Sequence, residues 1–176
     1  MTITAIKNAV TEVLPPVTPE AYREGMSSLA AAVNVVTTTG PEGHAGFTAT
    51  AVCSVSDNPA TLLVCLNRGA SVHQVFKNST HLVINTLTSQ HQLISNTFGG
   101  KAPMNERFEI GDWVESTTGC PRLADAAVSF DCIITDVKSV ATHDVIFCQV
   151  VDIKQDPEAD ALLYYQRGYH SACKDV

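Results

Sequence analysis

The chain has 176 residues, 45% of them hydrophobic and 16% charged, with a formal net charge of −7. This length suffices for one domain with its own core. The acidic balance and the absence of a Lys/Arg cluster exclude nucleic acid as an expected partner, and no apolar run approaches the length of a membrane span. Charged residues fall below the usual share of roughly a quarter, which is a weak indication of a homodimer.

The six cysteines and six histidines form no metal or redox motif. No CxxC pair, HExxH, GxSxG or GxGxxG pattern occurs, so zinc-ribbon, thioredoxin, metalloprotease, serine hydrolase and Rossmann interpretations are not supported, and we expect no metal site. The first 14 residues lack the basic start and long apolar run of a signal peptide. We therefore expect a cytoplasmic protein with reduced thiols.

The first elements expected are an arm, a helix and three strands. Residues 1–17 end in Pro15-Pro16 and are predicted to form a flexible N-terminal arm, and residues 18–176 one domain. Thr18, Pro19 and Glu20 form a helix start, and the helix is expected to stop near Ala30. Strands are predicted over residues 33–39, 44–56 and 61–66, and the short turns between them favour an antiparallel meander.

The long strand predicted over residues 44–56 has an unusual composition. Small residues alternate with the hydroxyls of Thr48, Thr50, Ser54 and Ser56, whereas a strand made for core packing carries bulky side chains. Small side chains allow close approach, and hydroxyls offer hydrogen bonds. The pattern fits either a strand packed tightly on a neighbour or a strand that faces a ligand.

A candidate anion site follows the third strand. Ser71 can cap a short helix over residues 72–76, and helix starts attract anions, with Arg68 adding charge. An ordinary loop with a helix cap explains the same residues. Lys101 could likewise contact a phosphate or be a solvated loop lysine.

The second half of the chain predicts further strands and one longer helix. A strand is expected over residues 81–86. A capping box of Thr88 with Gln92 starts a helix whose apolar face is Leu93, Ile94 and Phe98, and Gly99-Gly100 ends it. Strands are predicted over residues 128–135, 145–153 (buried on both faces) and 162–165, the last strand.

A resemblance to a known family is carried by Gly-Phe-Thr-Ala-Thr-Ala-Val-Cys-Ser-Val-Ser-Asp at residues 46–57, by Pro59, and by the run from Leu62 to Arg68. With these residues the chain resembles the short-chain flavin reductases. These are the reductase components of two-component flavin monooxygenases. The resemblance covers about residues 20–173. It implies a mainly β, antiparallel split β-barrel of the FMN-binding type with a few short helices. It also implies a homodimer with flavin at its interface, and a flavin-dependent monooxygenase as partner.

The function implied by this resemblance is that of an NAD(P)H:flavin oxidoreductase. Hydride from NADH, or from NADPH, reduces FMN or FAD at N5, and the reduced flavin is released to the monooxygenase. A non-catalytic flavin- or haem-binding split barrel, or a dimeric module that regulates an oxygenase, remains the alternative.

The resemblance also assigns roles to individual residues. His143, in a Thr-His-Asp hairpin tip, lies near flavin and nicotinamide, although a lone tip histidine without a role fits as well. Tyr169 packs at the flavin edge or in the dimer interface. The remaining flavin-binding candidates are Thr48, Ala49, Thr50 and Ala51 along the ring system, Ser54, Ser56, Asn67, Arg68, Ser71 and Lys101 at the ribityl and phosphate groups, and Asn85 in the same pocket.

Overall fold

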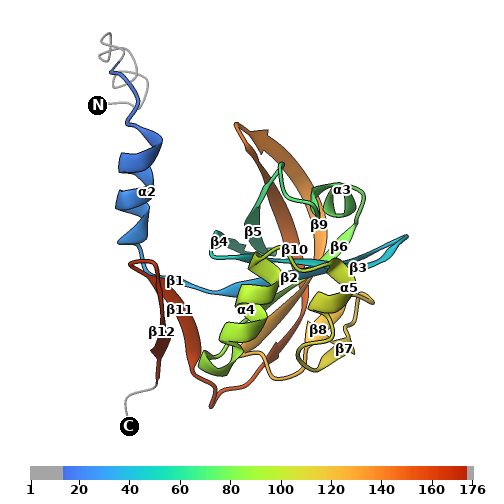
Figure 1. The fold of residues 1–176 in the computed structure, drawn as a ribbon. Helices are drawn as coiled ribbons and strands as arrows, with labels where there is room; N and C mark the ends of the chain where they lie inside the picture. Colours follow the sequence, from blue (N-terminus) through green and yellow to red (C-terminus); the bar gives the residue numbers. More distant parts are fainter. Residues whose placement is uncertain (1–13, 174–176) are drawn as a thin grey trace.

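The computed structural model describes residues 14–173. Most of the predicted arm therefore lies outside the described residues. The fold is mainly antiparallel β with short helices, as the sequence predicts (Figure 1). Within residues 14–173, no helix is long and apolar enough to cross a membrane.

A curved sheet of seven strands forms the body of the described chain. In spatial order its strands are β3 (Gly43–Ala49), β2 (Asn34–Gly40), β6 (His81–Thr86), β9 (Val128–Val140), β10 (His143–Gln155), β5 (Ala60–Asn67) and β4 (Val52–Asp57). Two smaller sheets pair β1 (Ala31–Ala32) with β11 (Ala161–Tyr165) and β12 (Gly168–Ala172), and β7 (Trp113–Glu115) with β8 (Pro121–Leu123). The helices are α2 (Pro19–Ser27), α3 (His73–Lys77), η1 (Ser89–His91), α4 (Gln92–Gly99) and α5 (Met104–Arg107).

The single long strand predicted over residues 44–56 is wrong, because the chain bends at Thr50 and Ala51. β3 pairs with β2, whereas β4 pairs with β5 at the opposite edge of the sheet. Both antiparallel pairings of the predicted meander do form, but the middle strand is divided into β3 and β4, so the meander becomes two hairpins. The Cys65 amide donates to the Ala51 carbonyl at 3.1 Å, which extends the β4–β5 pairing into the corner. Because the chain runs through this corner from one edge strand to the other, the corner closes the curved sheet on itself.

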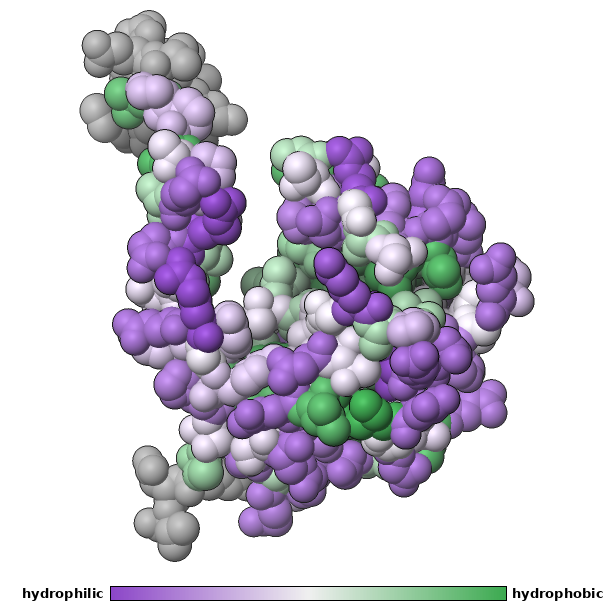
Figure 2. Space-filling model, in the orientation of Figure 1, coloured by the Kyte–Doolittle hydropathy of each residue, from purple (hydrophilic) through white to green (hydrophobic). Residues whose placement is uncertain are grey.

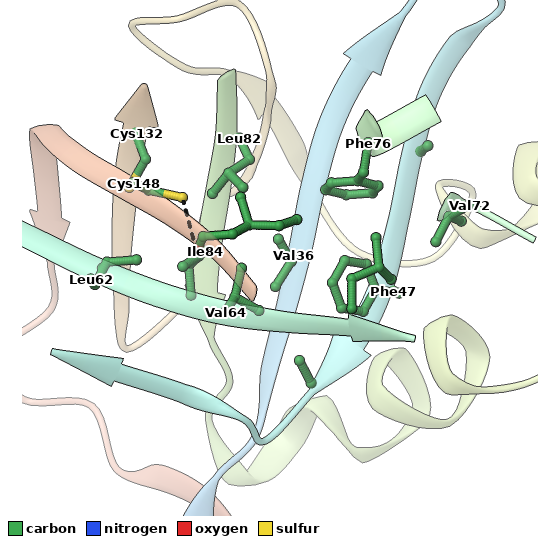
Figure 3. Packing of buried hydrophobic residues seen from close by; sticks show 14 residues of the cluster. Val36, Phe47, Leu62, Val64, Val72, Phe76, Leu82, Ile84, Cys132 and Cys148 are labelled. Atoms are coloured by element: carbon green, nitrogen blue, oxygen red, sulfur yellow. Dashed lines mark hydrogen bonds between the residues drawn. The ribbon is translucent and has the colours of Figure 1, made fainter. Parts of the chain in front are cut away.

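The main core fills the inside of this curved sheet (Figure 3). Inward side chains alternate along the strands, as one buried face requires. Phe47 of β3 meets Phe76 of α3 edge to face, with ring centroids 5.0 Å apart. Both rings belong to the same buried cluster as fully buried Val36 and Ile84. Phe47 also lines the cleft described below, so the core supports that cleft directly.

Helix α2 begins where the sequence predicts. The Thr18 hydroxyl accepts a hydrogen bond from the Ala21 amide at 3.2 Å, and Pro19 occupies the first turn. The helix ends at Ser27, short of the predicted Ala30, and none of its residues is buried. It stands away from the body, so its apolar side chains Tyr22 and Met26 are exposed (Figures 1 and 2).

Two predicted helix caps need correction. Thr88 does form a capping box, but its partner is His91, whose Nδ1 accepts from the Thr88 amide at 3.1 Å, and not Gln92. Helix α3 starts after Val72 without a side-chain cap, so Ser71 does not cap it. On α4, Ile94 and Phe98 are buried as predicted, but Leu93 is 62% exposed.

The C-terminal strands also differ from the prediction. Strands β9 and β10 form one long hairpin whose turn places Ala141 at a positive φ of 50°. The stretch 145–153 is not buried on both faces, since Val151 and Ile153 are exposed. Residues 162–165 are not the last strand either, because β12 follows β11 after a tight turn.

Candidate functional site

A cleft of about 370 Å³ lies beside the corner between β3 and β4. Its other walls are the end of β5, the segment before α3, the end of α4 and the tip of the β9–β10 hairpin. Residues far apart in the sequence converge here because the curved sheet brings its two edges together. The predicted residues that line it are Thr48, Ala49, Thr50, Ala51, Asn67, Ser71 and His143.

The corner is made of small residues, which leave the cleft open. Thr48 has a structural bond of its own, since its hydroxyl donates to the Ser95 carbonyl of α4 at 2.7 Å. The Asn67 side-chain oxygen accepts from the Gly69 amide at 2.7 Å, which fixes the loop. No Asp or Glu lines the cleft, so its polar groups suit an anion.

Arg68 lies beside the cleft but does not line it. Its guanidinium donates to the Ala141 carbonyl, and its amide donates to the Thr142 carbonyl at 3.0 Å. Both bonds hold the β9–β10 tip that carries His143. Arg68 thus serves this tip in the structure, rather than pointing its charge at the cleft.

Lys101 lines a second cavity of about 580 Å³. Ser71, Gly100 and Arg107 border both this cavity and the cleft, so the two spaces are neighbours that share a wall. The exposed Lys101 therefore lies at the end of the cleft where Ser71 also lies.

Arg107 is a residue of the site that the sequence analysis missed. It is only 6% exposed and donates to the carbonyls of Gly46, Phe98, Gly100 and Ala102 at 2.9–3.1 Å. Burial lowers the pKa of its guanidinium. By tying β3 to the segment after α4, Arg107 shapes the wall that Gly99 and Gly100 give to the cleft. No local motif marks such a residue, because its partners are backbone groups from distant positions.

Tyr169 borders a separate cavity of about 310 Å³ on the far side of Thr48 and Thr50. Its hydroxyl shares hydrogen bonds with Ser95 Oγ at 2.8 Å and Asn96 Oδ1 at 2.9 Å. Its ring meets Tyr164 edge to face at 5.5 Å between centroids. Tyr169 therefore lies next to the end of β3 and the corner at Thr50, but it does not line the main cleft.

Three more predicted residues lie outside these cavities, as Arg68 does. Ser54 and Ser56 are on the exposed edge strand β4, where Ser56 Oγ accepts from the Asn58 amide at 3.1 Å. Asn85 does not face the pocket: it is fully buried, donates to Val35 and Thr37, and accepts from Leu123 and Ser129. All of its polar atoms are used within the core, which corrects that expectation.

A model of the family "flavin reductase like domain" matches residues 26–172. The chain belongs to this family. An FMN reductase (NADH) RutF from Enterobacter cloacae subsp. cloacae is 52% identical over 152 residues, covering 86% of this chain and 93% of the relative. Another from Klebsiella pneumoniae subsp. pneumoniae is 54% identical over 150 residues, covering 85% and 92%. A flavin reductase structure from Haemophilus somnus has a TM-score of 0.87 and 46% identity, covering 89% of this chain and all of that one. These findings confirm the resemblance and the split-barrel fold class.

The cleft of this family member fits a flavin. Its small-residue corner leaves room for a flat ring, and its hydroxyl and amide groups with no carboxylate suit the ribityl and phosphate groups. Among residues 14–173, no group of His, Cys, Asp and Glu is arranged to hold a metal. The six cysteines are free thiols, and burial raises the pKa of Cys148 to about 12.

Proposed function

We propose that this protein is an NADH-dependent flavin reductase that acts on FMN or FAD. The observation that carries the proposal is the convergence of Thr48–Ala51, Asn67, Ser71 and His143 on one cleft without acidic residues. The RutF relatives are named FMN reductases that use NADH, so we expect FMN and NADH to be preferred. Residues 18–176 form the flavin-binding domain, and residues 1–17 the arm that precedes it.

In this proposal, some residues of the cleft bind the flavin ring and others bind its ribityl phosphate. Backbone groups of Thr48–Ala51 face the polar edge of the flavin ring, and Ser71 and Asn67 hold the ribityl phosphate. Lys101, at the same end, contributes positive charge from the second cavity. Tyr169 lines the separate cavity beyond Thr48, so we assign it no flavin contact within one chain. Arg68 contributes indirectly, because its bonds to Ala141 and Thr142 hold the hairpin tip that carries His143.

The bound flavin supplies the redox chemistry, accepting at N5 a hydride from the nicotinamide of NADH. The protein aligns the two rings, and alignment alone can supply several kcal/mol. His143, whose ring lines the cleft, contacts the nicotinamide side of the stack. The protein donates no proton in the hydride step. Reduced flavin is then released to a flavin-dependent monooxygenase, so modest affinity suits the task.

A second copy of the chain completes the site in this proposal. A groove of about 910 Å³ lies between α2 and strands β4 and β5, and it shares Thr50, Ala51 and Cys65 with the cleft. Figure 2 shows the space between α2 and the body. Met26 and Leu29 line this groove and are 44% and 61% exposed. Burial of such side chains by a partner copy is favourable, which supports a homodimer.

The test is NADH oxidation by the purified protein with FMN, FAD or no added flavin, followed by the absorbance of the reduced nicotinamide. Flavin-dependent oxidation is expected, faster with FMN than with FAD. Ser71→Ala should weaken FMN binding in a folded protein. A folded protein that oxidises no NADH with either flavin would refute the activity and leave a binding role. Light scattering in solution tests the dimer separately.

A further inference from the structure

Asp144 occupies a buried position directly after His143. It is only 6% exposed, and both of its oxygens are engaged. Oδ1 accepts from the Ser139 hydroxyl at 2.6 Å, and Oδ2 lies 2.7 Å from His73 Nε2. One carboxylate therefore joins β10 to β9 and to α3. We call Asp144, Ser139 and His73 the Asp144 network.

The network lies behind the cleft wall. Successive residues of a strand point to opposite faces, and His143 lines the cleft whereas Asp144 does not. Asp144 thus has no contact with a ligand in the cleft. Its bond to His73 reaches the start of α3, two residues after Ser71, which lines another part of the cleft. The carboxylate consequently links the wall that carries His143 to the wall that carries Ser71.

The other side-chain bonds at the hairpin tip are exposed, while the backbone of His143 pairs with Asn67 and Val140. Thr142 and Ala141 accept bonds from Arg68, which is exposed, and the Thr142 hydroxyl lies 2.9 Å from His143 Nδ1. Hydrogen bonds to a charged, buried acceptor are stronger than these exposed ones. The hydroxyl of Ser139 and then the ring of His73 hold the pKa of Asp144 below its usual range, so it is ionised at neutral pH.

We propose that Asp144 is a positioning residue for hydride transfer, which holds His143 at the cleft through its bonds to Ser139 and His73. The inference rests on the proposed function. Loss of the carboxylate should let the tip move, and small misplacements of aligned reactants are costly to rate. Flavin binding depends mainly on the other walls and should change less.

The first test compares Asp144→Asn with Asp152→Asn. Asp152 lies on the same strand and accepts from the Thr117 hydroxyl at 2.8 Å, but it borders neither the cleft nor the second cavity. Asp144→Asn should lower kcat for NADH oxidation with FMN by about 10- to 100-fold and change the Kd for FMN by less than about threefold. Asp152→Asn should leave both near wild type. Equal kcat in wild type and Asp144→Asn would overturn the inference.

A double-mutant cycle separates positioning from general loosening. If Asp144 acts through His143, then Asp144→Asn should lower kcat little further in a His143→Ala background. A full loss on top of His143→Ala would overturn the inference. So would a His143→Ala variant with wild-type kcat, because nothing would then need positioning.

The His73 and Ser139 bonds can be tested even where Asp144→Asn fails to fold. His73→Phe and Ser139→Ala each remove one donor, and both should lower kcat more than FMN affinity. His73→Gln keeps an N–H donor and should restore part of the rate. Active wild type with unaffected variants overturns this inference alone, whereas a wild type inactive with every flavin overturns the proposed function as well.

Discussion

Strands β3 and β4 come from one continuous stretch of similar composition, yet they occupy opposite environments. β3 is mostly buried from Ala45 onward, whereas β4 is exposed along nearly its whole length. They lie at the two edges of the same sheet. A strand of small residues can therefore pack tightly against another element, as β3 does, but the pattern alone does not require such packing, since β4 is exposed. The packed-strand interpretation holds for β3, and the cleft that we propose for the flavin opens at the corner between β3 and β4.

What separates the two strands is the set of elements that cover them. Helix α4 packs on β3, where Phe98 approaches Gly46, and Arg107 donates to the Gly46 carbonyl. Within the described chain, β4 contacts β5 and borders the groove next to α2. The cleft proposed for the flavin lies where the covered strand ends and the uncovered one begins.

The largest expected effect is on the covered side, from Arg107→Ala. This change removes the donor from two buried carbonyls, of Gly46 and Phe98, and from two partly buried ones, of Gly100 and Ala102. Each buried unpaired group costs about 1–3 kcal/mol. We expect the free energy of unfolding to fall by at least about 3 kcal/mol, measured by urea denaturation. Arg167→Ala is the matched control, because its partner Glu24 is exposed, and it should cost under about 1 kcal/mol. Similar losses in both variants would contradict the role given to Arg107.

Gly46→Ala should produce the next largest effect. A Cβ at Gly46 would lie 2.7 Å from Phe98 Cε1 and 3.1 Å from the Val36 carbonyl oxygen. Overpacking of this kind costs about 1–3 kcal/mol, which thermal unfolding would detect. Gly25→Ala is the control, since no atom lies within 4 Å of a Cβ in that exposed helix position, and it should be neutral or stabilising. A Gly46→Ala variant as stable as wild type would show that β3 is less tightly covered.

The sequence predicts what depends on local chemistry. The start of α2 at Thr18, the strand of β6 and the Gly100 end of α4 follow from caps, β-branched runs and glycines. Asn85 and Arg107 could not be placed, because their partners come from strands and loops distant in the sequence. The bend at Thr50 was hidden for the same reason, since only sheet closure requires it.

A third prediction compares FMN affinity after substitutions at the corner and on β4. Ala51→Leu puts bulk into the cleft and should weaken FMN binding at least tenfold, about 1.4 kcal/mol, with thermal stability retained because Ala51 is exposed. Ser54→Ala combined with Ser56→Ala should change FMN affinity by less than about twofold, since neither side chain reaches the cleft within one chain. A larger loss in the double variant would indicate that β4 of a second copy meets the flavin.

The smallest effect concerns pH and Asp144 on β10, whose carboxylate bonds to Ser139 of β9 and His73 of α3. The Ser139 hydroxyl and then His73, with Arg68 nearby, lower the folded-state pKa of Asp144. A lowered folded pKa means that its stabilisation is complete above the unfolded pKa of about 4 and is lost as the pH falls through the folded value. The difference in unfolding free energy between wild type and Asp144→Asn should therefore be constant near neutral pH and shrink below about pH 4. A difference that instead grows on acidification would show that the carboxylate is not held in its charged form. Because no such carboxylate pins β3, Gly46→Ala should show no comparable convergence with wild type at acid pH.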